Sequence, residues 1–211
     1  LDLDNTLWGG VVGDDGSENL RLGGHDPVGE AFANFQEEIL SLSNMGVILA
    51  ICSKNTESIA IEAIENHPEM KLRMDDFSSY RINWNDKASN IKSICKELNL
   101  GFDSVVFFDD SASERERVKT EIKEILVPDF PSDARFLPSF LNDLNCFDNF
   151  SFTEEDKLRK KSYKNRKDQI DLIDSKDQKS IDEWINSLNI EILVEKLNSK
   201  NLPRTTQLLN K

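Results

Sequence analysis

The stretch LDLDNTL at residues 1–7 places two carboxylates, Asp2 and Asp4, two positions apart at the end of a short apolar segment and before a turn. Side chains placed in this way after a strand can approach the same cation or the same phosphoryl group. Acidic residues are also common in turns, so the pair alone is weak evidence for a site. Whether this pair indicates a functional site therefore depends on which residues follow the other strands.

Two later segments are typical of buried parallel strands, and both lead to polar residues. Val47–Ile51 is a continuous apolar run that precedes Ser53, and Val105–Phe108 is a second run followed directly by Asp109 and Asp110. In open parallel sheets, ligands bind beyond the carboxyl ends of the strands. These side chains and the first two carboxylates are therefore expected to meet at one edge of a sheet.

The segments between and after these strands have apolar residues at helical spacing, which predicts an α/β fold. The expected helices are 28–44, 56–65, 87–98 and 113–123, and a short third strand is expected at 125–127. A single lysine, Lys87, opens the third of these helices, and Gly46 is placed to end the first. The glycine-rich residues 8–16 predict tight turns around a short hairpin. The alternation of strand and helix indicates a parallel sheet flanked by helices.

Composition excludes several classes of protein. The chain has 211 residues, 26 Lys and Arg against 39 Asp and Glu, and a net charge of −13. This acidic balance disfavours binding to nucleic acid, which usually requires a basic surface. No apolar run is long enough to span a membrane. Three scattered cysteines are too few for a disulfide scaffold, which favours a reducing compartment such as the cytoplasm.

The composition changes along the chain and divides it into three parts. We expect an α/β domain at 1–150, a charged helical linker at 151–179, and a partial C-terminal region at 180–211. In the C-terminal region, a short helix, a strand and a helix start are expected at 180–188, 189–194 and 203–209. Because the chain opens within the first motif, the first strand is expected to lack its upstream residues.

Taken together, the features at the strand ends resemble the four motifs of the haloacid dehalogenase (HAD) superfamily of phosphotransferases. In chain order they are Asp2 with Asp4, Ser53, Lys87, and Asp109 with Asp110. The resemblance covers about residues 1–130 and implies a Rossmann-like parallel sheet flanked by helices. Only 33 residues separate Ser53 from Lys87, so a large lid domain is not expected.

Longer strings resemble the FkbH-like branch of this superfamily, in subclass IIIC. They are LDLDNTLWGGVVGDDG (1–16), ICSKN (51–55), HPEM (67–70), INWNDKASNI (82–91) and FFDDSASERE (107–116). The string LPRTTQLLNK (202–211) resembles the start of the acetyltransferase-like C-terminal domain of that branch.

The resemblance implies a role for each motif residue. Asp2 would be the nucleophile that forms an aspartyl-phosphate, and Asp4 the general acid and then the general base. Ser53 would donate a hydrogen bond to phosphoryl oxygens, and Lys87 would neutralise charge.

The resemblance also implies a cofactor and contacts with the substrate. Mg²⁺ would be held by Asp2, by the backbone carbonyl of Asp4, and by a carboxylate of Asp109 or Asp110; spacing does not decide which of these two binds it directly. The turn N–H groups of Asn5 and Thr6, together with Asn55, would contact a phosphorylated small molecule.

Cys52 has two interpretations. The FkbH-like branch, associated with polyketide biosynthesis, moves a glyceryl unit from 1,3-bisphosphoglycerate to an acyl-carrier-protein thiol through an enzyme thioester, and a cysteine beside Ser53 could carry it. Buried cysteine also serves commonly as a small apolar residue, and alternation along a strand would point Cys52 and Ser53 to opposite faces. Because an acyl carrier protein and this chain would both be acidic, binding between them would need a local basic patch on this chain. Residues 157–167 are a candidate for that patch.

Two other functions remain open at this level. The chain could be a plain small-molecule phosphatase in which Cys52 only packs, or a non-catalytic module whose acidic cluster holds a cation. Trp8 and Trp84 could line a pocket or pack in the core. The segment 114–117 (ERER) is expected to be a solvated helix face, with a substrate-reading Arg115 as the alternative.

Overall fold

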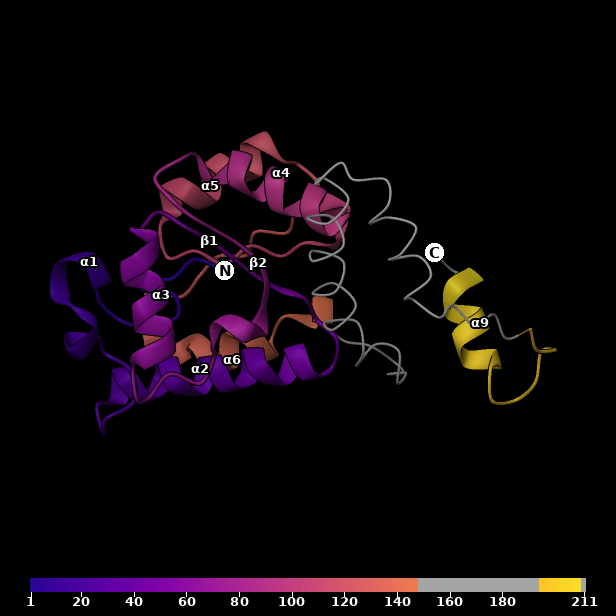
Figure 1. The fold of residues 1–211 in the computed structure, drawn as a ribbon, viewed down its shortest axis with the longest axis horizontal. Helices are drawn as coiled ribbons and strands as arrows, with labels where there is room; N and C mark the ends of the chain where they lie inside the picture. Colours follow the sequence, from indigo (N-terminus) through magenta and orange to yellow (C-terminus); the bar gives the residue numbers. More distant parts are fainter. Residues whose placement is uncertain (148–193, 210–211) are drawn as a thin grey trace, which may run out of the picture.

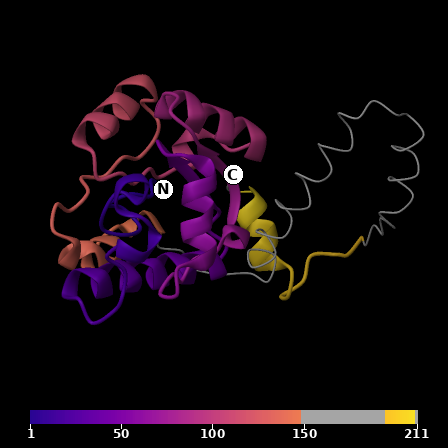
Figure 2. The same cartoon turned by 60° about the vertical axis from the view of Figure 1, so that its left-hand side comes forward.

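The structure is a computed structural model, and it describes residues 1–147 and 194–209. Its central layer is a sheet that contains β1 (Leu49–Ser53) and β2 (Phe77–Ile82). Helices cover both faces of this sheet, as Figure 1 and the turned view in Figure 2 show. The fold is therefore the expected α/β arrangement of three layers.

The sheet is parallel and has the N-terminal segment at its centre. β1 pairs with β2 in parallel register. On the other side of β1, the Leu1 N–H donates to the Ala50 carbonyl (2.9 Å) and the Cys52 N–H to the Leu1 carbonyl (2.8 Å). Further bonds extend the sheet through 105–108 to 125–127, beginning with Asp2 N–H to Phe108 C=O at 2.9 Å. The order 77–82, 49–53, 1–4, 105–108, 125–127 puts the first segment at the switch point, where ligands bind in such sheets.

One face of the sheet is covered by α2 (Pro27–Asn44), α3 (Glu57–Asn66) and α6 (Leu137–Asn142). Asp26 caps α2 by accepting from the N–H groups of Val28 and Gly29. The helix ends in a Schellman motif at Gly46, whose φ is 99°, with the Val47 N–H donating to Leu42 C=O at 3.0 Å. This motif uses Val47, so β1 begins two residues later than the apolar run predicts.

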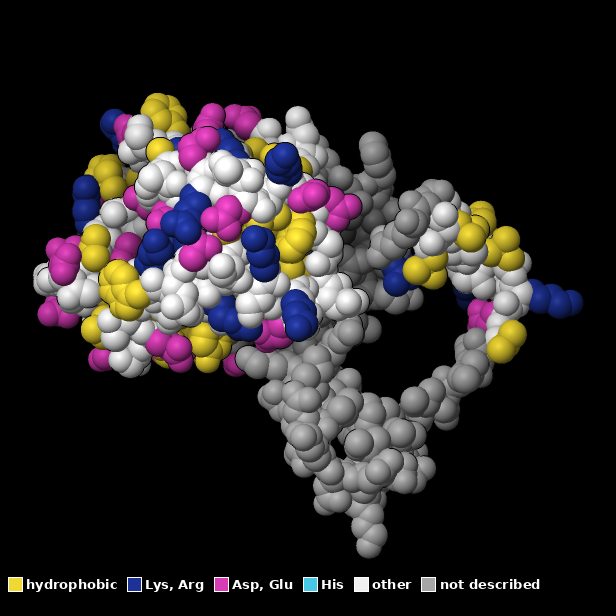
Figure 3. All heavy atoms as spheres, turned by 90° about the horizontal axis from the view of Figure 1, so that it is seen from above, with side chains coloured by type: hydrophobic (Ala, Val, Ile, Leu, Met, Phe, Trp, Pro, Cys, Tyr) yellow, Lys and Arg dark blue, Asp and Glu magenta, His cyan; other side chains and the backbone are white. Residues whose placement is uncertain are grey.

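The opposite face is covered by α4 (Lys87–Leu98), observed over its predicted residues, and α5 (Ala112–Glu121). Asp86 caps α4 and Ser111 caps α5. In the view from above (Figure 3), acidic and basic side chains alternate over these helices. Several pair, as Lys92 does with Glu121 at 3.6 Å.

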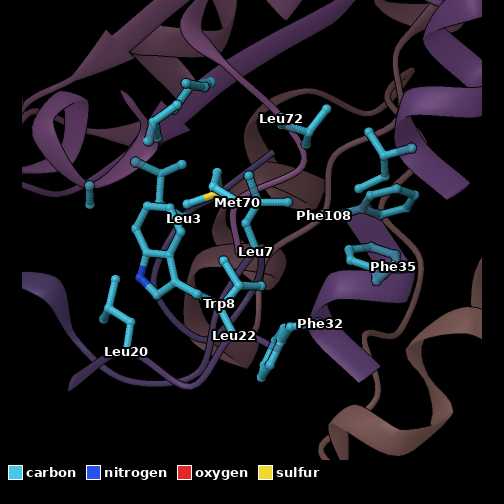
Figure 4. Close-up of a cluster of buried hydrophobic side chains, with 14 of the residues drawn as sticks. Leu3, Leu7, Trp8, Leu20, Leu22, Phe32, Phe35, Met70, Leu72 and Phe108 are labelled. Atoms are coloured by element: carbon cyan, nitrogen blue, oxygen red, sulfur yellow. The ribbon is translucent and has the colours of Figure 1, made fainter. Parts of the chain in front are cut away.

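The core on the α2 side is assembled around the first motif. Leu3 and Leu7 of the opening stretch pack with Trp8, and aromatic side chains of α2 and of the strand 105–108 lie beside them (Figure 4). Burial of the leucines on either side of Asp4 anchors the turn that carries it.

The glycine-rich region after this turn forms more than the hairpin that was predicted. Gly9 and Arg21 exchange backbone hydrogen bonds of 3.0 and 2.8 Å, which is one antiparallel bridge. The loop between them contains α1 (Val12–Asp15) and a 3-10 helix η1 (Ser17–Asn19). The remaining short elements are η2 (Met74–Asp76), η3 (Phe102–Ser104), η4 (Ala134–Phe136) and η5 (Asn145–Phe147), and near the C-terminus α9 (Leu202–Leu209) forms where a helix start was expected.

Most of the predicted C-terminal organisation lies outside the described residues. This includes the linker at 151–179, the helix at 180–188, nearly all of the strand at 189–194, and the basic segment 157–167. Within the described part of the chain, none of the helices has the length and apolar character needed to cross a membrane.

A buried glutamine, Gln36, links the turn of the first motif to the backbone at residues 71–72. The Gln36 side chain donates to Leu7 C=O at 2.8 Å and accepts from the N–H groups of Lys71 and Leu72 at 3.0 and 3.2 Å. We expect Gln36→Leu to lower the free energy of unfolding by about 3 kcal/mol, because it leaves buried backbone groups unpaired. Denaturant unfolding measures this, with exposed Asn34→Leu as control; a loss below about 1 kcal/mol would contradict it.

Candidate active site

The sheet brings the motif residues together at the carboxyl ends of its central strands. Asp2 follows Leu1 in the central segment, Asp109 follows the neighbouring strand 105–108, and Lys87 is the first residue of α4. All three side chains are buried, with exposed fractions of 6%, 0% and 3%. Residues that lie up to 107 positions apart therefore share one water-poor site.

Lys87 bridges the two buried carboxylates. Its Nζ lies 2.9 Å from Asp2 Oδ2 and 2.6 Å from Asp109 Oδ2. Burial alone would lower the pKa of this lysine, but the two carboxylates outweigh it and raise the pKa to about 12. Lys87 therefore stays charged, and it compensates only part of the negative charge around it.

A third carboxylate completes a cluster with the geometry of a cation site. Oxygens of Asp2, Asp109 and Asp110 all lie within 4.8 Å of one another. Burial, and then the charge of Asp2, raises the pKa of Asp109 to about 6 and also raises that of Asp110. Asp2 Oδ1 is buried without a hydrogen-bond partner among the described residues. An unpaired buried oxygen beside two further carboxylates fits a hard divalent cation.

Asp4 is held apart from this cluster by three donors. Its Oδ1 accepts from the Trp8 indole Nε1 at 2.9 Å and from the Val12 N–H at 3.0 Å, and its Oδ2 accepts from Asn55 Nδ2 at 2.9 Å. Burial raises the pKa of Asp4 despite these donors. Trp8, for which the sequence leaves a pocket or a core position open, is fully buried, and its indole N–H orients the Asp4 carboxylate. In the sequence, the one indication of this contact is that Trp8 follows Asp4 by four residues.

The turn residues Asn5 and Thr6 make contacts within the protein, and the Thr6 N–H is not available for its expected role. Asn5 has a left-handed φ of 52°, and its side chain accepts from the Gly10 N–H at 2.9 Å. The Thr6 N–H is already donated to Leu3 C=O at 3.0 Å, so it is not free to bind a substrate. Instead, the Thr6 hydroxyl accepts from the Asp110 N–H at 3.2 Å. Thr6 thus joins the first motif to the fourth.

Ser53 and Cys52 lie at the end of β1 in different surroundings. Ser53 is the last residue of the strand and is buried at the same sheet edge. Cys52 packs in the apolar cluster beneath α4, with its thiol donating weakly to Lys87 C=O at 3.6 Å. Burial raises the pKa of Cys52 to about 12, so almost no thiolate forms at neutral pH. The surroundings therefore favour the packing interpretation over the nucleophile.

Thiol labelling tests this placement. We expect iodoacetamide to modify Cys146, which is exposed, and to leave Cys52 and Cys95 unmodified in the folded protein, because both are buried. Peptide mass spectrometry gives the site of each label, and labelling in denaturant is the control in which all three react. Rapid labelling of Cys52 in the native state would contradict the burial described.

Among the residues that the structure describes, the two histidines and Trp84 form no hydrogen bond or ion pair with the three carboxylates of the cluster. His67 accepts from the Glu69 N–H through Nδ1 at 3.3 Å, and His25 occupies an exposed left-handed turn. Trp84 follows β2 at the sheet edge that carries the site, and it is 72% exposed. Its loop is fixed by Asn83, whose Oδ1 accepts from Asn90 Nδ2 at 2.9 Å.

Comparison with known proteins adds one finding. No protein-family model and no curated protein matches the chain. A solved structure does: the N-terminal part of the protein BF1531 from Bacteroides fragilis, which contains a phosphatase domain and is complexed with Mg. It is 48% identical with a TM-score of 0.70, and the match covers 72% of this chain and 40% of that one. The chain has a phosphatase-domain fold.

Proposed function

We propose that the chain is a Mg²⁺-dependent phosphatase of the HAD type that acts through an aspartyl-phosphate on Asp2. The observation that carries this proposal is the unpaired Asp2 Oδ1 within the cluster of three carboxylates. The similar structure that contains a phosphatase domain with Mg supports it. Asp2, Asp109 and Asp110 would hold the cation, which supplies positive charge that shields the anionic substrate from the carboxylates.

The side chains around Asp2 divide the reaction between them. A carboxylate oxygen of Asp2 bonds to phosphorus, and the bond between phosphorus and the leaving oxygen breaks. Asp4 gives its proton to that oxygen, and its raised pKa helps it carry the proton. Lys87 fixes Asp2 Oδ2 and neutralises charge that develops on the phosphoryl group.

The second half of the reaction, hydrolysis of the aspartyl-phosphate, returns the enzyme to its starting state. Water attacks phosphorus and gives a proton to Asp4, and the bond from phosphorus to Asp2 breaks to release inorganic phosphate. Asn55 and Trp8 keep the Asp4 carboxyl facing the same position in both halves.

Phosphate release tests the proposal directly. The protein is incubated with p-nitrophenyl phosphate and acetyl phosphate, with Mg²⁺ or with EDTA. We expect phosphate release only with Mg²⁺, and mass spectrometry after acid quenching should find the phosphoryl group on Asp2. Mg²⁺ binding without release from any phosphate ester or acyl phosphate would instead favour the cation-binding module.

We also propose a finer activity, which rests on the resemblance to the FkbH-like branch: transfer of a glyceryl unit from 1,3-bisphosphoglycerate to an acyl-carrier-protein thiol in the cytoplasm. Exposure of Asp110 and of Trp84, which both follow strands at the same edge of the sheet, supports access of a large acceptor. In the described part of the chain, Cys52, Cys95 and Cys146 form no disulfide, which agrees with a reducing compartment. Burial of Cys52 argues against a thioester there.

Mass spectrometry of a holo carrier protein incubated with the enzyme, Mg²⁺ and bisphosphoglycerate tests the transfer. Phosphate release without an acyl adduct would leave the plain phosphatase.

A further inference from the structure

Arg115 lies in the acidic and basic segment of α5 that was expected to form a solvated face, but its side chain turns back toward the site. Its Nη1 donates to the backbone carbonyls of Asp109 and Asp110, both at 2.8 Å. The last ladder bond of this strand is the one that Phe108 C=O accepts from Asp2. The two carbonyls that Arg115 binds therefore lie just beyond the sheet, where the ladder no longer holds them.

These two carbonyls flank the Cα atom of Asp110. The orientation of one peptide plane sets φ of Asp110 and that of the other sets ψ. One guanidinium nitrogen that holds both planes therefore sets the direction in which the Cα–Cβ bond of Asp110 leaves the backbone. The Asp110 N–H donates to Thr6 Oγ1, and the Ser111 N–H donates to Asp109 Oδ1 at 2.9 Å. Within the described residues, the carbonyl side of this loop is held by Arg115.

We propose that Arg115 is a positioning residue that presents the Asp110 carboxylate to the divalent cation. The inference rests on the proposed function, because it concerns the same cation site. Groups that orient metal ligands contribute strongly to metal affinity, and their removal costs about 10-fold to 100-fold. Arg115 does not touch the substrate or the cation in this proposal.

Charge and positioning predict opposite results, which makes the proposal testable. If Arg115 acted only through its positive charge, Arg115→Met would tighten Mg²⁺ binding by removing a repulsive neighbour. If it positions Asp110, Arg115→Met weakens binding. Arg115→Lys keeps the charge but loses the planar guanidinium, and it is also expected to weaken binding.

The experiment titrates the metal-free full chain with Mg²⁺ by calorimetry. We expect the Kd for Mg²⁺ to rise about tenfold in both variants, while the melting temperature without metal changes little. The matched controls are Arg135→Lys and Arg135→Met. Arg135 is an exposed arginine that forms an ion pair of 2.6 Å with Asp133, and this pair does not belong to the site. These controls should bind Mg²⁺ as the wild type does.

Activity provides a second readout. We expect the Arg115 variants to need more Mg²⁺ for half-maximal phosphate release and to regain most of the wild-type rate at saturating Mg²⁺, which a misfolded site would not. Unchanged or tighter Mg²⁺ binding in both variants would overturn the positioning role of Arg115 and leave the proposed function standing. Absence of Mg²⁺ binding by the wild type would overturn the proposed function as well.

Discussion

Asp2→Asn is expected to lower kcat for phosphate release by a factor on the order of 10⁴ or more, as removal of a catalytic nucleophile does in other enzymes. A factor of 10⁴ corresponds to roughly 5 kcal/mol of transition-state free energy. An amide is a far weaker nucleophile than a carboxylate. Phosphate release at saturating substrate and Mg²⁺ measures the loss, and trapping experiments should find no phosphoryl group on residue 2.

The same variant separates chemistry from folding. The charge of Asp2 contributes to the raised pKa of Asp109, so its removal relieves repulsion in the metal-free protein. We therefore expect the melting temperature without metal to stay equal or rise, and the stabilisation by Mg²⁺ to shrink. The control is Asp14→Asn on the exposed side of α1, which should behave as the wild type. Full activity in Asp2→Asn would rule out the proposed nucleophile.

The sequence predicts the parts of this fold that depend on local pattern. Val105–Phe108 is apolar throughout, and α4 carries a regular apolar stripe, so both are visible without tertiary information. β2 was missed because Ser78, Ser79 and Arg81 interrupt its apolar residues. Those two serines are buried in the structure. Their burial is a consequence of tertiary packing, which no local pattern reports.

The site shows the same division. The acidic residues and Lys87 could be named because they stand at strand ends and a helix start, whose common edge follows from parallel topology. The contacts that orient them depend on turn geometry: Trp8 reaches Asp4 across the turn, and Arg115 reaches back over the loop at 109–111. Neither contact follows from a repeat or a periodicity. The charged groups could therefore be predicted from the sequence. Trp8 and Arg115 could be named as candidates, but their contacts with the first and fourth motifs could not be predicted.

Lys87→Met should destabilise the metal-free protein by about 3–5 kcal/mol, the usual cost of removing one partner from a buried ion pair. Lys87 is almost fully buried and lies between Asp2 and Asp109 at 2.9 and 2.6 Å. Without it, two buried carboxylates face each other with no compensating cation. Denaturant unfolding in EDTA measures the change, and Lys92→Met on the exposed side of α4 is expected to change stability by less than about 0.5 kcal/mol.

Mg²⁺ should reverse much of this destabilisation without restoring activity. A cation bound at the three carboxylates replaces the lost positive charge, whereas the transition state still lacks the group that neutralises the phosphoryl oxygens. Lys87→Met that is as stable as the wild type in EDTA would show that the pair contributes no net stability.

A second substitution identifies the origin of the cost. In the double variant Lys87→Met with Asp109→Asn, one of the uncompensated charges is also removed. If repulsion and desolvation of the carboxylates cause the loss, the double variant will be more stable than the sum of the two single changes by about 1–3 kcal/mol. If the loss came from poor packing of the methionine, the two effects would simply add. Lys87 would then contribute to stability through its shape rather than through its charge, and the site's tolerance of two adjacent carboxylates would need another source.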